Sequence, residues 1–378
     1  MEKELNELLS VADNPGRTVR EWKNREGFKV IGSLPIYVPE EMIHAAGALP
    51  VKLWGGKTEL ERVNAHLQGF ACSIVRAVLE YSLKNTYEVV DGFVFPSTCD
   101  HIQNASDIFG NLFPHRPKFD LVYPENSKSK AAEDYLEKLL TAFQKWLEKL
   151  TGNKTVDKNL IESIRVFNHY RELIGKLYRI QRENPRSVRG REVAALVKSS
   201  FFMPRELFNQ KLEGLLPWLE NRVVKEHPRA RLILTGIMAE PEEILEIMDE
   251  LGIAVVADDL ALGQRIFRTR VDETLEPMKG MVRRHLSLGP CSTIFDPAKS
   301  RSALLLQLAE EAAADGVVFI NMKFCEKEEF DYPVLKQELE QVGLPLLFLE
   351  VEQQMSSFGQ VRTRLQAFTE LLAQEESV

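Results

Sequence analysis

The sequence predicts an α/β fold with two Rossmann-like parallel α/β domains joined by a helical region. Short apolar runs alternate with helical patterns in the first and last thirds of the chain, long amphipathic patterns fill the middle, and one motif occurs in both halves. Alternating strands and helices are typical of parallel sheets covered by helices. We expect an N-terminal α/β domain over residues 1–150, a helical connector over 151–227 and a C-terminal α/β domain over 228–378.

The first half contains four runs that are expected to be strands. They are rich in β-branched and aromatic residues and are bounded by turn signals; they span Phe28–Leu34, Leu49–Trp54, Val89–Phe95 and Phe119–Tyr123. A helix is expected over Pro39–Ala46, where a proline and two glutamates form a favourable first turn. A further helical pattern covers Leu60–Leu83, with Gly69 as a point of division.

The middle of the chain is predicted to be helical, and a second α/β half follows it. Apolar residues recur at helical spacing over Ser129–Leu150 and Val156–Arg182, and again up to Leu219 after a break at Asn184-Pro185. The expected strands of the second half are Arg231–Gly236, Gly252–Ala257, Ala314–Met322 and Leu344–Glu350, with helices over Pro241–Leu251 and Gly359–Leu372.

Composition and charge narrow the class of protein. The 378 residues are 44% hydrophobic and 28% charged, as in a globular protein with a sizeable core. The net charge of −8 argues against nucleic-acid binding, because no basic field is available to displace counterions from phosphates. The polar N-terminus shows no signal-peptide pattern and the apolar runs are too short to span a bilayer, so we expect a cytoplasmic protein without a membrane partner.

The motif shared by the two halves ends in a cysteine. Residues 91–99 read DGFVFPSTC and residues 315–325 read DGVVFINMKFC, so each motif is Asp-Gly, a buried strand and a loop cysteine. Cys99 and Cys325 are therefore expected just beyond the carboxyl ends of two strands, where open α/β sheets bind ligands. Two such ends facing each other would form a cleft between the domains.

The remaining cysteines are Cys72, at or near a helix start, and Cys291, in the segment GPCST. Four cysteines are too few for a disulfide framework. Helix starts and strand-end loops present N–H groups that stabilise thiolates. The sequence has no C-x-x-C pair, so the common zinc and ferredoxin signatures are absent. Spacing alone leaves open a shared metal site and four small buried hydrophobic side chains.

Several segments resemble the 2-hydroxyacyl-CoA dehydratase and benzoyl-CoA reductase family. They are residues 32–51 (GSLPIYVPEEMIHAAGALPV), residues 95–100 (FPSTCD), residues 323–325 with 330–333 (KFC and FDYP) and residues 359–368 (GQVRTRLQAF). The resemblance implies a [4Fe–4S] cluster in the interdomain cleft, held by Cys72, Cys99 and Cys325. Three thiolates leave one iron open to water or a substrate oxygen, by the logic of an open zinc site.

Cys291 is the ambiguous cysteine within this resemblance. It could close the fourth iron position and make an electron-transfer cluster, or it could be a thiol outside the cluster. A related branch of the family carries a double-cubane cluster held by more cysteines than one [4Fe–4S] cluster needs. With four cysteines in total, this chain is not expected to belong to that branch.

Other residues of the resembling segments have two interpretations each. His44 is either an acid/base or thioester-contacting group near the cluster, or a capping or packing histidine. Asp100 and His101 directly follow Cys99 and could tune the cluster, whereas Asp100 could simply cap the next helix.

Two arginines of the C-terminal segment are candidates for binding coenzyme A. Arg362 and Arg364 could recognise its phosphates, because the guanidinium group suits phosphate geometry. The alternative is an ordinary charged helix face.

The activity implied by the resemblance is the dehydration of an (R)-2-hydroxyacyl-CoA to a 2-enoyl-CoA. One electron on the thioester carbonyl gives a ketyl radical, which expels hydroxide and acidifies the β-proton. Such an electron is strongly reducing, and cluster potentials reach about −700 mV. The sequence has no G-x-x-x-x-G-K-[ST] loop, so the resemblance implies a separate ATP-dependent iron–sulfur activator, together with a homologous or identical second subunit. The alternatives are a benzoyl-CoA reductase-type subunit that reduces an aromatic acyl-CoA and a non-catalytic electron-relay subunit.

Overall fold

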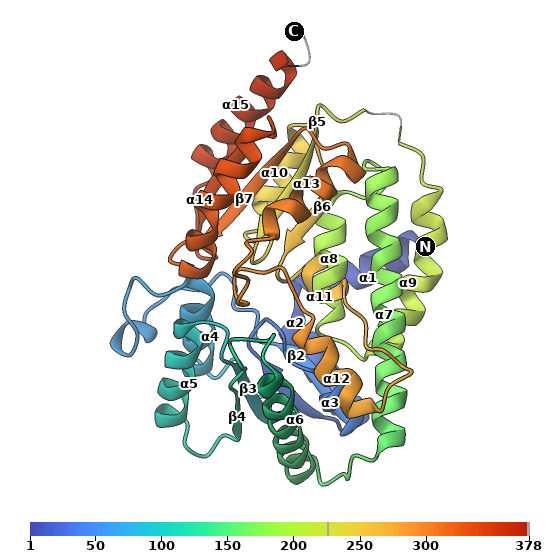
Figure 1. Ribbon diagram of the computed structural model, residues 1–378, viewed down its shortest axis with the longest axis vertical. Helices are drawn as coiled ribbons and strands as arrows, with labels where there is room; N and C mark the ends of the chain where they lie inside the picture. The colour runs from blue at the N-terminus through green and yellow to red at the C-terminus, as the bar shows by residue number, and fades with distance from the viewer. Residues whose placement is uncertain (225–226, 376–378) are drawn as a thin grey trace.

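The computed structural model describes residues 1–224 and 227–375 and contains two four-stranded parallel sheets (Figure 1). The first sheet has the order β2-β1-β3-β4, with β1 Lys29–Ser33, β2 Ala48–Lys52, β3 Gly92–Pro96 and β4 Lys118–Leu121. The second has the order β6-β5-β7-β8, with β5 Ala230–Gly236, β6 Ile253–Leu260, β7 Gly316–Met322 and β8 Leu346–Val351. The shared strand order confirms the prediction of an α/β fold with two Rossmann-like parts.

Helices form most of the remaining described chain. The first half contains α1 Glu2–Asp13, α2 Pro15–Glu26, α3 Glu40–Ala45, α4 Ser73–Leu83, α5 Asp100–Leu112 and α6 Lys130–Thr151. The middle contains α7 Asp157–Glu183, α8 Gly190–Ser200 and α9 Arg205–Glu220. The second half contains α10 Glu243–Glu250, α11 Gln264–Phe267, α12 Pro277–Leu286, α13 Arg301–Ala312, α14 Glu326–Gln341 and α15 Gly359–Glu375. Within the described residues, no helix has the length and apolar character that crossing a membrane requires.

The Asp-Gly pair that the two halves share has the same structural role in each. The Asp91 carboxylate accepts a hydrogen bond from the Val30 N–H at 2.8 Å, and the Asp315 carboxylate accepts one from the Arg231 N–H at 2.6 Å. Each aspartate thus provides the hydrogen-bond acceptor for a backbone N–H near the start of the neighbouring strand, β1 or β5. The aspartate fixes the amino end of the motif, and the cysteine follows at the opposite end of the strand.

The helical pattern over residues 60–83 divides, as Gly69 allowed. Only α4 is α-helical, and a single 3₁₀ turn, Val63–Ala65, precedes it. The Glu80 carboxylate accepts a hydrogen bond from the Val63 N–H at 2.8 Å and pairs with Lys84 at 3.1 Å. This buried acceptor holds the segment before α4 against the helix instead of allowing it to extend the helix.

The two halves share a core. Val271, Met281 and Val282 come from the second half of the sequence, but they pack in one hydrophobic cluster with Ile31 of β1 and Val94 of β3. In this way α12 lies against α6 and α7 (Figure 1). Strands β1–β4 precede the helical connector in the sequence and β5–β8 follow it, as expected. The exact boundaries of the three predicted domains stay a prediction.

Candidate functional site

Cys72, Cys99 and Cys325 line one cavity, called the cysteine cavity below. Cys99 follows β3 and Cys325 follows β7, whereas Pro35 and Ile237, also in the lining, follow β1 and β5. In each sheet these two strands are neighbours, and the chain order reverses between them. Ligands of open α/β sheets bind at this reversal, so the ligand-binding edges of both sheets meet at the cysteine cavity.

Each of the three cysteines is the residue immediately before a helix. Cys72 precedes α4, Cys99 precedes α5 and Cys325 precedes α14. Helix amino ends carry unpaired N–H groups and partial positive charge, so they stabilise anions such as thiolates. The N–H groups that face the sulfurs belong to Ile74 and Val75 for Cys72, His101 and Ile102 for Cys99, and Glu328 for Cys325.

The donor set of the cysteine cavity fits an iron–sulfur cluster. Burial raises the pKa of the Cys72 thiol to about 12 and also raises the pKa of Cys99 and of Cys325, and the neighbouring thiols add to the effect for Cys72 and Cys325. Three neighbouring thiols, one buried and two half-buried, become thiolates together only beside positive charge, which a cluster would provide. Across residues 1–224 and 227–375, no group of three His, Cys, Asp or Glu side chains is close enough to hold a single metal ion. Cluster thiolates each bind a different iron and therefore stand farther apart.

Cys291 lies apart from the other three cysteines. Its Sγ atom is 3.3 Å from Nη1 of Arg265 and 3.2 Å from Oγ1 of Thr293, and it does not line the cysteine cavity. Thr293 does line that cavity, so Cys291 lies behind the wall that Thr293 forms. The structure therefore brings three of the four predicted metal ligands together and places the ambiguous one against an arginine.

The Arg265 side chain belongs to a buried charge network, which consists of Asp259, Arg265, Arg301 and Glu328. Asp259 pairs with Arg265 at 2.9 Å and with Arg301 at 2.8 Å. Glu328 pairs with the same two arginines at 3.2 and 2.8 Å. Glu328 lies in the first turn of α14, where its N–H donates to the Cys325 carbonyl at 3.0 Å. The network thus anchors the helix start that carries Cys325.

His44 does not reach the cysteine cavity. It lies in α3, with Nδ1 3.0 Å from the Ser163 hydroxyl and Nε2 2.9 Å from the Glu206 carboxylate. Its ring also packs edge-on against Phe167, with 5.7 Å between the centroids. Both ring nitrogens are hydrogen-bonded to α7 and α9, and this arrangement favours the interpretation of a packing histidine.

Arg362 and Arg364 are exposed on α15. Arg362 forms an ion pair with Glu250 of α10, and neither arginine lines the cysteine cavity. The structure therefore places them on a charged helix face and does not bring them to the predicted cluster.

A second cavity of about 200 Å³ adjoins the cysteine cavity, and sequence reasoning missed most of it. The two cavities share Thr98, Cys99, Thr293 and Lys327. Lys327 could have been found, because it lies in the first turn of the helix that starts after Cys325. The predicted candidates divide between the two cavities, with Asp100 in the adjoining cavity and His101 in the cysteine cavity.

The far wall of the adjoining cavity carries a histidine and a tyrosine. His285 of α12 packs against Tyr123 with 4.0 Å between the ring centroids and the ring planes tilted by 31°. Desolvation and the adjacent Arg284 cation lower the pKa of His285 well below its ordinary value, so the imidazole is neutral at pH 7. Nothing in the local sequence marks His285, because it reaches the site only through the crossing of α12 into the first half.

Comparison with known proteins assigns this arrangement to a family. Residues 35–372 match the family model of the 2-hydroxyglutaryl-CoA dehydratase D-component. The chain is 31% identical to the beta subunit of (R)-phenyllactyl-CoA dehydratase from Clostridium sporogenes, over 98% of this chain and 99% of that one. It is 33% identical to the beta subunit of lactoyl-CoA dehydratase from Anaerotignum propionicum, over 97% and 98% of the two chains. It is 28% identical to one of the subunits of benzoyl-CoA reductase from Thauera aromatica, over 93% of each chain. The chain therefore belongs to the 2-hydroxyacyl-CoA dehydratase and benzoyl-CoA reductase family.

Proposed function

We propose that this chain is the [4Fe–4S] subunit of an oxygen-sensitive, cytoplasmic radical enzyme that dehydrates an (R)-2-hydroxyacyl-CoA to a 2-enoyl-CoA. The observation that carries the proposal is the convergence of Cys72, Cys99 and Cys325 on one cavity, at the ligand-binding edges of both sheets. These three thiolates would hold the cluster, which when bound supplies an electron at low potential and a Lewis-acidic iron.

The adjoining cavity is suited to the reacting end of the substrate. Its volume of about 200 Å³ matches an acyl group, and it meets the cysteine cavity at Thr293 and Lys327. The Lys327 ammonium and the Thr293 hydroxyl are donors that can stabilise negative charge on a thioester carbonyl held between them. The neutral His285 ring, packed against Tyr123, would bound the acyl group on the far side without adding charge.

The position of Cys291 supports a catalytic role over an electron relay. A relay would be expected to complete its cluster with a fourth thiolate, whereas Cys291 contacts Arg265 and lies outside the cysteine cavity. Three protein thiolates leave an iron position open for a substrate oxygen. A non-catalytic relay remains the alternative if a partner subunit binds the substrate.

The relatives support a partner and leave a second reaction type open. Two of them are named beta subunits of dehydratases, so we infer a second subunit, homologous or identical, and an ATP-dependent activator that delivers the electron. The identity to the benzoyl-CoA reductase relative makes reduction of an aromatic acyl-CoA the alternative activity.

The cluster is tested by quantifying iron and sulfide in anaerobically purified protein. We expect about four irons per chain in the wild type, as one [4Fe–4S] cluster requires. Cys99→Ser should lose the cluster, and Cys291→Ser should keep both the iron and the visible spectrum of the wild type. A colourless, iron-free wild type after reconstitution would sink the cluster assignment, and loss of iron from Cys291→Ser would favour the relay.

The reaction is tested by turnover of the reconstituted complex with its partner subunit and activator. Lactoyl-CoA and phenyllactyl-CoA cover a small and an aromatic acyl group, and mass spectrometry detects the loss of water. Formation of the 2-enoyl-CoA supports the dehydratase. Ring reduction of benzoyl-CoA without dehydration of either hydroxyacyl-CoA would favour the reductase.

A further inference from the structure

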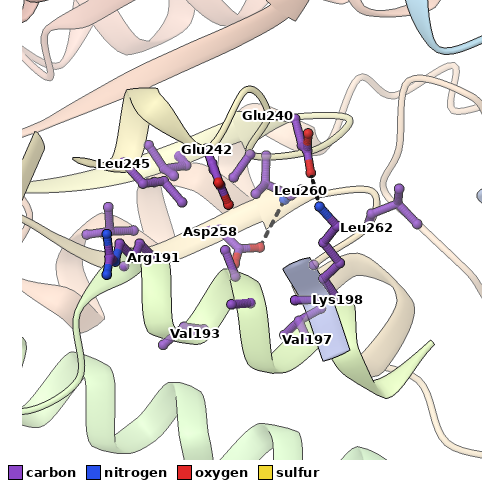
Figure 2. Close-up of a pocket in the computed structure, with 18 of the residues that line it drawn as sticks. Arg191, Val193, Val197, Lys198, Glu240, Glu242, Leu245, Asp258, Leu260 and Leu262 are labelled. Carbon is purple, nitrogen blue, oxygen red and sulfur yellow. Dashed lines mark hydrogen bonds and ion pairs between the residues drawn. The ribbon is translucent and has the colours of Figure 1, made fainter. Parts of the chain in front are cut away.

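A cavity of about 380 Å³, called the α8 cavity below, lies away from the cysteines, none of which lines it. Figure 2 shows helix α8 on one side of it and the strands and loops of the second sheet on the other. Part of the wall is apolar and includes Leu9, Val193, Val197, Leu245, Val255 and Leu262. The volume and the mixture of apolar wall and few polar groups are typical of a small-molecule site.

Two ion pairs close the ends of the α8 cavity. Arg191 pairs with Glu246 at 2.9 Å at one end, and Lys198 pairs with Glu240 at 2.7 Å at the other. Figure 2 shows Lys198 reaching across the cavity to Glu240, with Arg191 at the opposite end. Trp54 also donates from Nε1 to Glu240 at 2.8 Å. Both cations in the lining are therefore engaged by carboxylates.

Carboxylates remain between these two pairs. Asp13, Glu242 and Asp258 line the α8 cavity, and none of them forms an ion pair with a residue in the described part of the chain. Asp258 and Glu242 lie between the closing pairs in Figure 2. The lining contains five carboxylates and two cations, and the nearby Arg268 guanidinium is bonded to Asp259 and to the Asp258 carbonyl.

Asp258 is held rigidly with its carboxylate in the cavity wall. It is 6% exposed, and its Oδ1 accepts hydrogen bonds from the Leu260 N–H at 3.1 Å and the Gln264 N–H at 2.9 Å. A Cβ on Gly263 would lie 2.4 Å from the same oxygen, so the turn after β6 presses against this carboxylate. Burial raises the pKa of Asp258 and outweighs the opposing effects of a hydrogen bond from the Tyr178 hydroxyl, also in the lining, and of the nearby Arg268 cation.

A second observation points to an absent hydrogen-bond donor. Gln181 of α7 lines the α8 cavity, is 1% exposed, and its Oε1 has no hydrogen-bond partner in the described structure. Buried amide oxygens are nearly always paired. The cavity is the side from which a donor could come, and a cationic N–H donor would suit both Gln181 and the carboxylates that form no ion pair.

We propose that the α8 cavity binds a small organic cation, namely a primary ammonium or amidinium group carried on an apolar body. The charged group would lie between Asp258 and Glu242 within reach of Gln181, and the body would pack on the leucine and valine wall. The acidic lining opposes phosphate, so the site is distinct from any that would receive the phosphates of coenzyme A. Its walls come from both halves of the chain, because α1 and Trp54 face β5 and β6 across it.

The experiment uses the full chain and benzylamine as the probe, with binding measured by saturation-transfer NMR and titration at pH 7. Benzyl alcohol has the same shape without the charge, and benzoate carries the opposite charge. We expect benzylamine to bind, and both analogues to bind at least about tenfold more weakly, as for a buried charge pair. No saturable benzylamine binding, or equal binding of benzyl alcohol, would overturn the proposal.

Variants locate the site. Asp258→Asn should weaken benzylamine binding about tenfold or more, because this carboxylate is buried. Glu242→Gln should weaken it about two- to fivefold, because Glu242 is exposed and its charge is screened by water. Glu243→Gln is the matched control, since Glu243 is the next residue but pairs with Lys57 and does not line the cavity. Circular dichroism checks that each variant is folded, and equal binding by all three would contradict the location.

Discussion

Replacing Asp259 by Asn should destabilise this protein strongly, because it removes one charge from the buried charge network. Asp259 is 0% exposed and its carboxylate contacts Arg265 at 2.9 Å, Arg301 at 2.8 Å and Arg268 at 3.3 Å. Asn keeps the shape of Asp but accepts with one oxygen only and carries no charge. The variant therefore tests the charge and leaves the packing nearly unchanged.

The magnitude follows from the charge balance. Within the buried charge network, Asp259 and Glu328 contribute two negative charges, and they face the two positive charges of Arg265 and Arg301. Asp259→Asn leaves one buried positive charge without compensation. Breaking a buried pair in this way costs about 3–5 kcal/mol, a large share of the roughly 5–15 kcal/mol that stabilises a typical native protein.

The pH dependence gives an independent check. Burial alone would raise the pKa of Asp259, but Arg265 and Arg301 outweigh burial and hold it below its ordinary value. The carboxylate's stabilisation is therefore fully present above its unfolded pKa of about 3.9 and is lost as the pH falls through the lower folded pKa. The difference in the free energy of unfolding between wild type and variant should be constant from pH 6 to 8, to within about 0.5 kcal/mol.

The assay is anaerobic urea unfolding followed by far-UV circular dichroism. Glu21→Gln is the control, because Glu21 pairs with Arg17 on the surface, where the side chains are 63% and 74% exposed, and its loss should cause no measurable change. If Asp259→Asn lowers the free energy of unfolding by less than about 1 kcal/mol, the reasoning is refuted, since the stability of the buried charge network would then not depend on this charge.

Three further variants test the site. His44→Gln should lower the free energy of unfolding by about 1 kcal/mol through weakened hydrogen bonds and leave iron content and turnover unchanged; a large loss of turnover would restore an acid/base role. Arg362→Ala combined with Arg364→Ala should leave the KM for the acyl-CoA unchanged, because both side chains are exposed on α15, and a clear increase would show that they bind coenzyme A. Gly236→Ala should lower the unfolding midpoint and the iron content, since Gly236 has φ of 144° and a Cβ there would lie 2.3 Å from the Ile320 carbonyl oxygen. Wild-type stability of that variant would show that β5 and β7 can separate without cost.

The strands were predictable because buried parallel strands appear as apolar runs between turn signals. The apolar run that ends at Met322 is an example, since its residues predict both a buried strand and the point where the strand ends. The end of β6 was not predictable in the same way. Asp258 and Asp259 resemble a turn after Ala257, but β6 continues to Leu260 because arginines from elsewhere in the chain pair with Asp259 inside the core.

The candidate site was predictable where it depends on strand ends and not where it depends on helix direction. Cys99 and Cys325 could be placed together because each follows a buried strand at the same edge of its sheet. His44 could not be assigned, because the sequence does not say whether its face of α3 meets the cysteines or α7 and α9. His285 could not be predicted for a related reason. Helix α12 belongs to the second half of the sequence but packs on the first half.

The crossing of α12 also orders the events of biosynthesis. The hydrophobic cluster that contains Ile31 and Val94 also includes Val271, Met281 and Val282. The core of the first half therefore lacks part of its apolar cover until α12 has left the ribosome. By then β5 and β6 have already been synthesised, since both precede α12 in the chain. The nascent chain cannot finish one half before starting the other, as separate domains do. A chain that ends ahead of Pro277 should therefore be prone to aggregation, although all four strands of its first sheet are present.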